Sequence, residues 1–145
     1  MKKILSLPTF YDFFQNMVGA TKIRKILLND YLSVKPGARI MDIGCGTAEI
    51  LDLLPDVDYY GFDMSQEYID CARRKYGDRG HFECIRVSEQ VLENLEGFDF
   101  ALALGILHHC SDSEAEYLMK LGYKALKPGG TLLTFDGCMV DGQSR

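Results

Sequence analysis

A glycine-rich turn is the feature of this sequence whose residue types and spacing point most directly to chemistry. The turn, Gly44-Cys45-Gly46, follows a short apolar run that contains Asp42 and precedes a stretch of helical character. Gly44 permits a tight turn, and Gly46 has no Cβ that would hold a ligand away from the backbone. The first N–H groups of a helix lack partners within the helix, so they can face a ligand. The turn therefore predicts a ligand-binding loop.

Asp63 stands at the end of the next predicted strand along the chain. An acid in this position can accept hydrogen bonds from both hydroxyl groups of a ribose. Each feature alone has a simpler interpretation, in which the glycines only turn the chain and Asp63 only caps the following helix. Their occurrence together, in strand–turn–helix–strand order, favours nucleoside binding.

Details of the loop discriminate among nucleotides. A dinucleotide-binding loop has a third glycine, but here Glu49 occupies that place and would repel a pyrophosphate. The lysine followed by serine or threonine of a phosphate-binding P-loop is also absent from the loop. Asp42, directly before the turn, suits a ligand that carries an ammonium or sulfonium cation.

The elements that must position these residues alternate along the chain. We predict strands at residues 38–44, 58–64, 81–87, 98–105 and 131–137. We predict helices at residues 10–34, 47–54 and 65–77, a short helix or turn at 88–97, and a helix from Ser111 to about Lys127 with a capping box of Ser111 and Glu114. Such alternation predicts an α/β fold with a doubly wound, Rossmann-like, mostly parallel sheet of about five strands. The ligand of such a sheet lies outside the carboxyl ends of the strands.

Bulk properties narrow the class of protein. The 145 residues predict one domain, with an N-terminal helical cap at 1–36 and an α/β core at 37–145. The formal charge of -5 argues against a nucleic-acid partner. Five cysteines without a CxxC motif indicate neither a disulfide framework nor a metal site, and they suit a cytoplasmic protein. No apolar run is long enough to span a membrane.

Four stretches in order resemble the class I S-adenosylmethionine (SAM)-dependent methyltransferases. They are RIMDIGCGTAEIL, YYGFDMS, FDFALALGILHHCSD and LKPGGTLLTFD. The resemblance covers roughly residues 37–137 and implies SAM as cofactor, S-adenosylhomocysteine (SAH) as product and methyl transfer as the reaction. It implies nothing specific about the acceptor; from the charge and the LHH loop we expect a small molecule.

The resemblance also implies roles for individual residues. Asp42 would hold the methionyl amino group, and Asp63 would bind the ribose. Gly44, Cys45 and Gly46 would form the loop beneath the cofactor. The adenine would contact Met64, Val87 and Ser88, and the end of the fourth strand would contribute Leu104 and Gly105. Relatives often hold the adenine amino group with an acid after the third strand, where this chain has Ser88 followed by Glu89.

Three further residues keep two interpretations each. Tyr11 could contact the cofactor and Arg24 could pair with its carboxylate, or Tyr11 packs in the core and Arg24 is solvated. His108 is a weak candidate for a general base near the methyl acceptor; the alternative, which we favour, is local packing within the loop, and no catalytic residue is assigned. We expect His108 rather than His109 to line the cofactor pocket.

The sequence departs from the family at its C-terminal end. The family sheet usually continues with an antiparallel hairpin beside the fifth strand, for which the residues after Phe135 leave no room. We therefore expect a truncated core, with either self-association through the edge of the fifth strand or a disordered tail at that edge. A module that binds SAM or SAH without turnover is the alternative to an active methyltransferase, and a nicotinamide or nucleotide-diphosphate enzyme is a third, disfavoured by Glu49.

Overall fold

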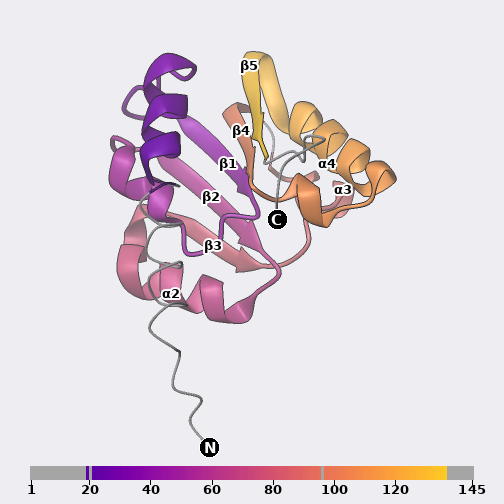
Figure 1. The fold of residues 1–145 in the computed structure, drawn as a ribbon, viewed down its shortest axis with the longest axis horizontal. Coiled ribbons are helices and arrows are strands. Elements are labelled where there is room, and N and C mark those ends of the chain that lie inside the picture. Colours follow the sequence, from indigo (N-terminus) through magenta and orange to yellow (C-terminus); the bar gives the residue numbers. More distant parts are fainter. Residues whose placement is uncertain (1–18, 20, 96, 137–145) are drawn as a thin grey trace, which may run out of the picture.

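The computed structural model describes residue 19 and residues 21–95 and 97–136. Its centre is a sheet of five parallel strands in the order β3-β2-β1-β4-β5 (Figure 1). The strands are β1 (Arg39–Ile43), β2 (Asp58–Asp63), β3 (His81–Cys84), β4 (Phe98–Leu104) and β5 (Leu126–Phe135). The strand order reverses between β1 and β4, so the topological switch point lies at the end of β1. The predicted doubly wound parallel sheet is confirmed.

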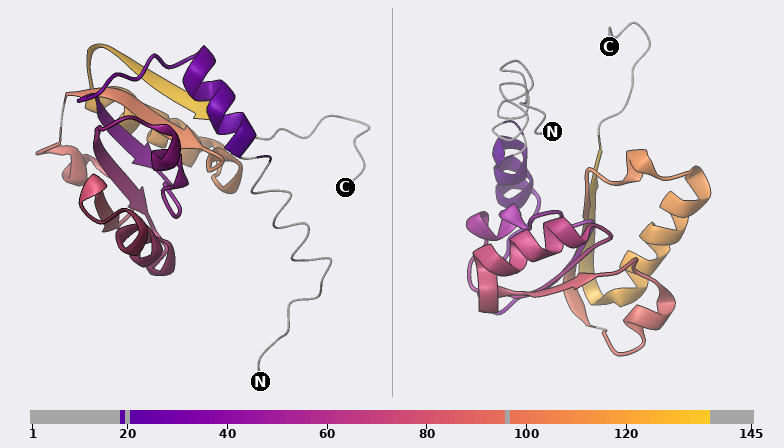
Figure 2. Two further views of the ribbon diagram at one scale, coloured as in Figure 1. Left: turned by 90° about the vertical axis from the view of Figure 1, so that its left-hand side faces the viewer. Right: turned by 90° about the horizontal axis from the view of Figure 1, so that it is seen from below.

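Helical segments cover both faces of this sheet (Figures 1 and 2). They are residues 21–30, the 3₁₀ helices η1 (Glu49–Leu53), η2 (Gly77–Arg79) and η3 (Leu107–His109), and the α-helices α2 (Gln66–Tyr76), α3 (Glu89–Leu92) and α4 (Asp112–Ala125). Among the described residues, no helix is long and apolar enough to cross a membrane.

Successive residues of the central strands point to opposite faces and build two separate cores. Ile40 packs in the cluster beneath η1 and α2, whereas its neighbour Met41 packs in the cluster beneath α3 and α4. Leu102 and Ala101 of β4 divide in the same way. This is why the central strands read as apolar on both faces. The sheet is thereby held rigidly, with its carboxyl ends at one edge.

Two helix predictions are confirmed, α2 with both of its ends and α4 with its start, although α4 ends at Ala125, before the predicted end near Lys127. α2 begins after Ser65, whose side chain accepts the N–H of Tyr68, and ends at Gly77. α4 begins with the complete capping box: the Ser111 side chain accepts the N–H of Glu114, and the Glu114 carboxylate accepts the N–H of Ser111. Such caps satisfy N–H groups that have no partner inside the helix.

Several predicted bounds differ from the structure. Residues 47–54 form only the 3₁₀ helix η1, because Ala48 takes a left-handed conformation (φ 58°) and leaves little length before Pro55. β3 ends at Cys84, and β5 already begins at Leu126, with a pairing irregularity opposite Phe98–Phe100. Helix is present at residues 21–30 but not at 31–34, and most of residues 10–20 lie outside the described part. The cap and core division stays a prediction, as does association through β5.

Candidate functional site

The glycine-rich turn is pinned to the neighbouring strand. The N–H groups of Gly44 and Cys45 both donate to the carbonyl of Phe62, at 2.8 and 3.0 Å. Gly44 has φ +74°, and a Cβ there would lie 2.3 Å from Cγ2 of Ile106. Gly46 also has a positive φ, but nothing lies within 4 Å of the place of its Cβ. Gly44 is therefore required by the turn and its packing, whereas Gly46 leaves open space beside the backbone.

Asp63 is bound to this same turn. One carboxylate oxygen accepts the N–H of Gly46 at 2.9 Å, and the other accepts the N–H of Ser65 at 2.8 Å. The structure thus brings together the loop and the acid that the sequence analysis paired. Because a carboxylate has about four acceptor positions, two remain for a ligand such as a diol.

Asp42 lies beneath the turn and is 4% exposed. Its carboxylate accepts the hydroxyl of Tyr59 at 2.6 Å. Burial raises the pKa of Asp42 to about 6, and the hydrogen bond from Tyr59 offsets part of this rise. Tyr59 was not predicted as a site residue; its only signal in the sequence was an aromatic residue with a polar tip in a strand beside that of Asp42. A buried, partly protonatable carboxylate is suited to pairing with a cation.

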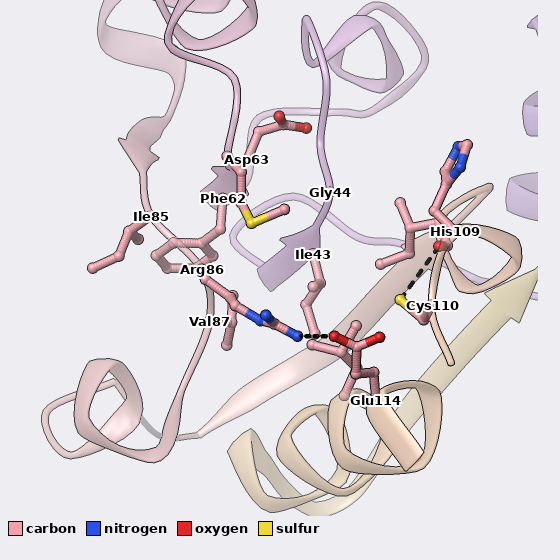
Figure 3. Close-up of a pocket in the computed structure, with 13 residues that line it drawn as sticks. Ile43, Gly44, Phe62, Asp63, Ile85, Arg86, Val87, His109, Cys110 and Glu114 are labelled. Carbon is pink, nitrogen blue, oxygen red and sulfur yellow. Dashed lines mark hydrogen bonds and ion pairs between the residues drawn. The ribbon is translucent and has the colours of Figure 1, made fainter. Parts of the chain in front are cut away.

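A cavity of about 240 Å³ opens beside the turn, at the switch point (Figure 3). Its walls are mostly apolar and come from the ends of β1 and β2, the segment after β3, the loop after β4 and the start of α4. The lining residues are Ile43, Gly44, Phe62, Asp63, Met64, Ile85, Arg86, Val87, Ile106, His109, Cys110, Glu114 and Leu118. Four of the predicted site residues are therefore among them: Gly44, Asp63, Met64 and Val87.

Other predicted residues lie around the cavity without lining it. Cys45 is buried; burial raises the pKa of its thiol, so it is a poor nucleophile. Ser88 caps α3, its hydroxyl accepting the N–H of Val91. Leu104 ends β4, and Gly105 donates its N–H to the carbonyl of Phe135 at 2.7 Å.

Arg24 pairs with Glu49 rather than lying free in solvent. Its Nη1 lies 3.5 Å from Oε2 of Glu49, and both side chains are about one-third exposed. The pair joins the N-terminal helical segment to η1, close to the glycine-rich turn. Tyr11 lies outside the described residues.

His108 is held by an acid at the end of β5. Its Nδ1 lies 2.7 Å from Oδ1 of Asp136, and the N–H groups of Leu107 and His108 also donate to this carboxylate. Burial opposes ionisation of Asp136, but these hydrogen bonds outweigh it and lower its pKa. His109, not His108, lines the cavity. The Asp136 contact was missed because no local pattern links residues this far apart in the sequence.

Comparison with known proteins places this geometry in a family. A family model described as "Methyltransferase domain" matches residues 41–132, which include the turn, the acid and α4. The chain belongs to this methyltransferase family. The resemblance to the class I SAM-dependent methyltransferases is thereby confirmed.

Individual relatives agree. The Saccharomyces cerevisiae tRNA (carboxymethyluridine(34)-5-O)-methyltransferase is 29% identical over 122 residues, covering 82% of this chain and 43% of that protein. A Homo sapiens protein named "Probable tRNA methyltransferase 9B" is 32% identical over 108 residues, covering 70% of this chain and 22% of that protein. The chain thus spans less than half the length of either relative.

A solved structure supports the fold. The magnesium protoporphyrin IX methyltransferase of Synechocystis PCC 6803, with bound SAM, superposes with a TM-score of 0.61 at 18% identity, covering 87% of this chain and 62% of that one. At this identity the likeness concerns the fold alone.

These relatives correct one prediction. We expected a small-molecule acceptor and no nucleic-acid partner, but the yeast and human relatives are named as tRNA methyltransferases. The inference from the formal charge of -5 was wrong because net charge averages over the whole surface, whereas RNA binding depends on local patches and on shape. A cytoplasmic location stays a prediction.

Proposed function

We propose that this chain binds SAM in the cavity beside the glycine-rich turn and transfers its methyl group to an acceptor on tRNA. One observation carries the proposal: the N–H of Gly46 in the turn donates a hydrogen bond to Asp63. This contact lies at the switch point of a sheet that belongs to the methyltransferase family. The single group-transfer reaction that this family is named for needs such a site for its cofactor.

The residues present fit SAM in three respects. Asp63 keeps acceptor positions for the ribose hydroxyls after its two backbone hydrogen bonds. The apolar walls next to it, which include Met64 and Val87, suit a flat purine. Open space beside Gly46 lets the rest of the cofactor approach the backbone.

The amino-acid end of SAM carries an ammonium and a carboxylate. Asp42 would attract the ammonium, directly or through a water molecule, and the carbonyls of Leu104 and Gly105 lie at the strand end where further acceptors are needed. Arg24 would pair with the carboxylate if it exchanged its contact with Glu49 for the cofactor. Cys45 and Ser88 would contribute backbone contacts, since their side chains already have other partners.

SAM supplies an electrophilic methyl group on a sulfonium sulfur. The residues of the chain need to align the acceptor with the methyl carbon and the sulfur, and to keep water away. A carboxylate acceptor, as in the carboxymethyluridine named for the yeast relative, is ionised at neutral pH and needs no general base. Other acceptors would lose a proton, and His108, held through Nδ1 by Asp136, is the residue we propose for accepting it.

Methylation of tRNA tests the proposal. The full chain would be incubated with SAM that carries a tritiated methyl group and with tRNA that contains carboxymethyluridine, and radioactivity in the RNA would be counted. We expect transfer to this RNA and none to the same RNA with plain uridine. SAH binding without transfer to any RNA would contradict the tRNA acceptor and favour a binding module.

A further inference from the structure

An open apolar groove, separate from the cofactor cavity, has no role in the proposal above. It lies between the helical segment 21–30 and the end of β5. We infer that this groove, together with the lysines beside it, is the surface on which a single-stranded loop of the tRNA docks. The inference rests on the proposed function, because it names the surface that would hold the proposed acceptor.

The groove has a volume of about 410 Å³ and is lined mainly by apolar side chains. Figure 2 shows the helical segment beside the end of β5. The large side chains that line the groove and are open to solvent are Ile23, Ile26, Tyr31 and Phe135. Tyr31 is 69% exposed and Phe135 is 41% exposed. An exposed apolar patch of this kind with a polar rim is typical of an interaction site.

The rim of the groove is positively charged. Lys22 and Lys25 are three residues apart on the helical segment, so they project from the same side of it, and both are exposed. None of the ion pairs among the described residues involves either lysine. Residues 21–30 contain three cationic side chains and one anionic side chain, whereas the chain as a whole carries a formal charge of -5. The local charge is therefore opposite in sign to the net charge.

Charges on the other side of the cofactor cavity have the opposite sign. The first turn of α4 contains Asp112 and Glu114, and Glu114 lines the cavity. An RNA backbone would be repelled by these carboxylates and attracted by the lysines. The charge distribution thus favours an approach of the RNA from the side of the helical segment.

The groove is continuous with the site of methyl transfer. Phe135 is followed by Asp136, whose carboxylate accepts the N–H groups of Leu107 and His108. The next residue of that loop, His109, lines the cofactor cavity. An RNA loop bound in the groove therefore lies next to the carboxyl edge of the sheet, where one of its nucleotides can reach the methyl group.

The chemistry of the surface matches single-stranded RNA. Unpaired bases stack on aromatic side chains, and phosphates bind lysines. Tyr31 and Phe135 provide aromatic rings, and Lys22 and Lys25 provide cations within one or two helical turns of them or of their neighbours in the groove. A double helix keeps its bases stacked inside and would leave the aromatic rings unused. An apolar protein partner would leave the lysines without a counter-charge, so charge complementarity favours RNA.

Fluorescence anisotropy of labelled tRNA that contains carboxymethyluridine, titrated with the full chain at several salt concentrations, tests the lysines. The double variant Lys22→Gln with Lys25→Gln should bind the tRNA more weakly. Its slope of log affinity against log salt should be smaller by about 1.4, since each phosphate contact of a single strand contributes about 0.7. The matched control, Lys120→Gln with Lys124→Gln, changes two lysines of α4 that pair with glutamates and should keep the slope.

A second variant tests the aromatic contact. Tyr31→Ala should weaken tRNA binding by about tenfold, the loss expected for one stacked base. The matched control, Tyr123→Ala, removes an exposed tyrosine of α4 and should bind the tRNA as wild type does. Calorimetry with SAH shows whether each variant is folded, and we expect unchanged SAH binding in all of them.

The outcomes separate this inference from the proposed function. An unchanged salt slope in the lysine variant, or unchanged affinity in Tyr31→Ala, would overturn the docking surface and leave the proposed function standing. Wild type that binds SAH but no tRNA would overturn both the docking surface and the tRNA acceptor.

Discussion

Replacing Asp42 with asparagine should change how the stability of the ligand-free chain depends on pH. The carboxyl group is 4% exposed, and burial raises its pKa to about 6, despite the opposing hydrogen bond from Tyr59 and the charge of Arg24. In an unfolded chain the pKa of an aspartate is about 3.9. The folded chain therefore binds this proton more tightly than the unfolded chain.

The sign and size of the effect follow from this difference. Between about pH 4 and pH 6 the unfolded chain releases a proton that the folded chain still holds, so stability falls as the pH rises through this range. A difference of about 2 pKa units corresponds to a loss of about 3 kcal/mol. Asparagine carries no charge and keeps a carbonyl that can accept from Tyr59, so Asp42→Asn should lack this loss.

Urea-induced unfolding at pH 4 to 7 measures the effect. We expect the unfolding free energy of wild type minus that of Asp42→Asn to fall by about 2 kcal/mol across this range, since about half of the unfolded aspartates are already ionised at pH 4. The control is Asp52→Asn, since a hydrogen bond from exposed Lys75 lowers the pKa of Asp52 and its small contribution is instead lost as the pH falls. Parallel stability curves for wild type and Asp42→Asn would refute the account of Asp42 as a buried carboxylate with a raised pKa.

Three further substitutions test the loop and its surroundings. Gly44→Ala should destabilise the chain by about 2 kcal/mol or more, because its new Cβ would clash with Ile106 and its positive φ is unfavourable for alanine. Gly46→Ala, which has the positive φ but no clash, should cost only about 1 kcal/mol. Equal melting temperatures for the two variants would contradict this. Ser111→Ala removes the cap of α4 and should cost about 1 kcal/mol in chemical unfolding, and an unchanged unfolding midpoint would show that the capping box adds little. Glu49→Gln removes the ion pair of Arg24 and should tighten SAH binding, measured by calorimetry. The gain should be at most about fivefold, since a partly exposed ion pair contributes at most about 1 kcal/mol. Unchanged or weaker binding would argue against a role of Arg24 at the cofactor carboxylate.

The sheet and the loop could be predicted from the sequence because their signals are local. Apolar runs ending in Gly44, Asp63 and Gly105 identified the central strands, and the parallel topology then required their carboxyl ends to meet at one edge. The pairing of Ser111 with Glu114 is likewise a short-range pattern, and it predicted the start of α4.

Contacts between distant residues could not be predicted in this way. Glu114 reads in the sequence only as a cap, and its contact with Arg86 depends on how α4 packs against the segment after β3. The hydrogen bonds from Tyr59 to Asp42 and from His108 to Asp136 also depend on strand register and on the position of β5. The shortening of the expected helix at residues 47–54 arises from the left-handed Ala48, a residue type that gives no sign of this conformation.

The central claim is that the cavity beside the glycine-rich turn binds SAM through Asp63. Calorimetric titration of the full chain with SAM, SAH and NAD tests it most directly, with Asp63→Asn as variant. The matched control is Asp70→Asn, whose half-exposed side chain lies on α2 outside the cavity. We predict dissociation constants on the order of micromolar for SAM and SAH, no binding of NAD, at least about tenfold weaker binding by Asp63→Asn and no change in Asp70→Asn. Folded wild type that binds neither SAM nor SAH, or equal affinity in Asp63→Asn, would contradict the claim.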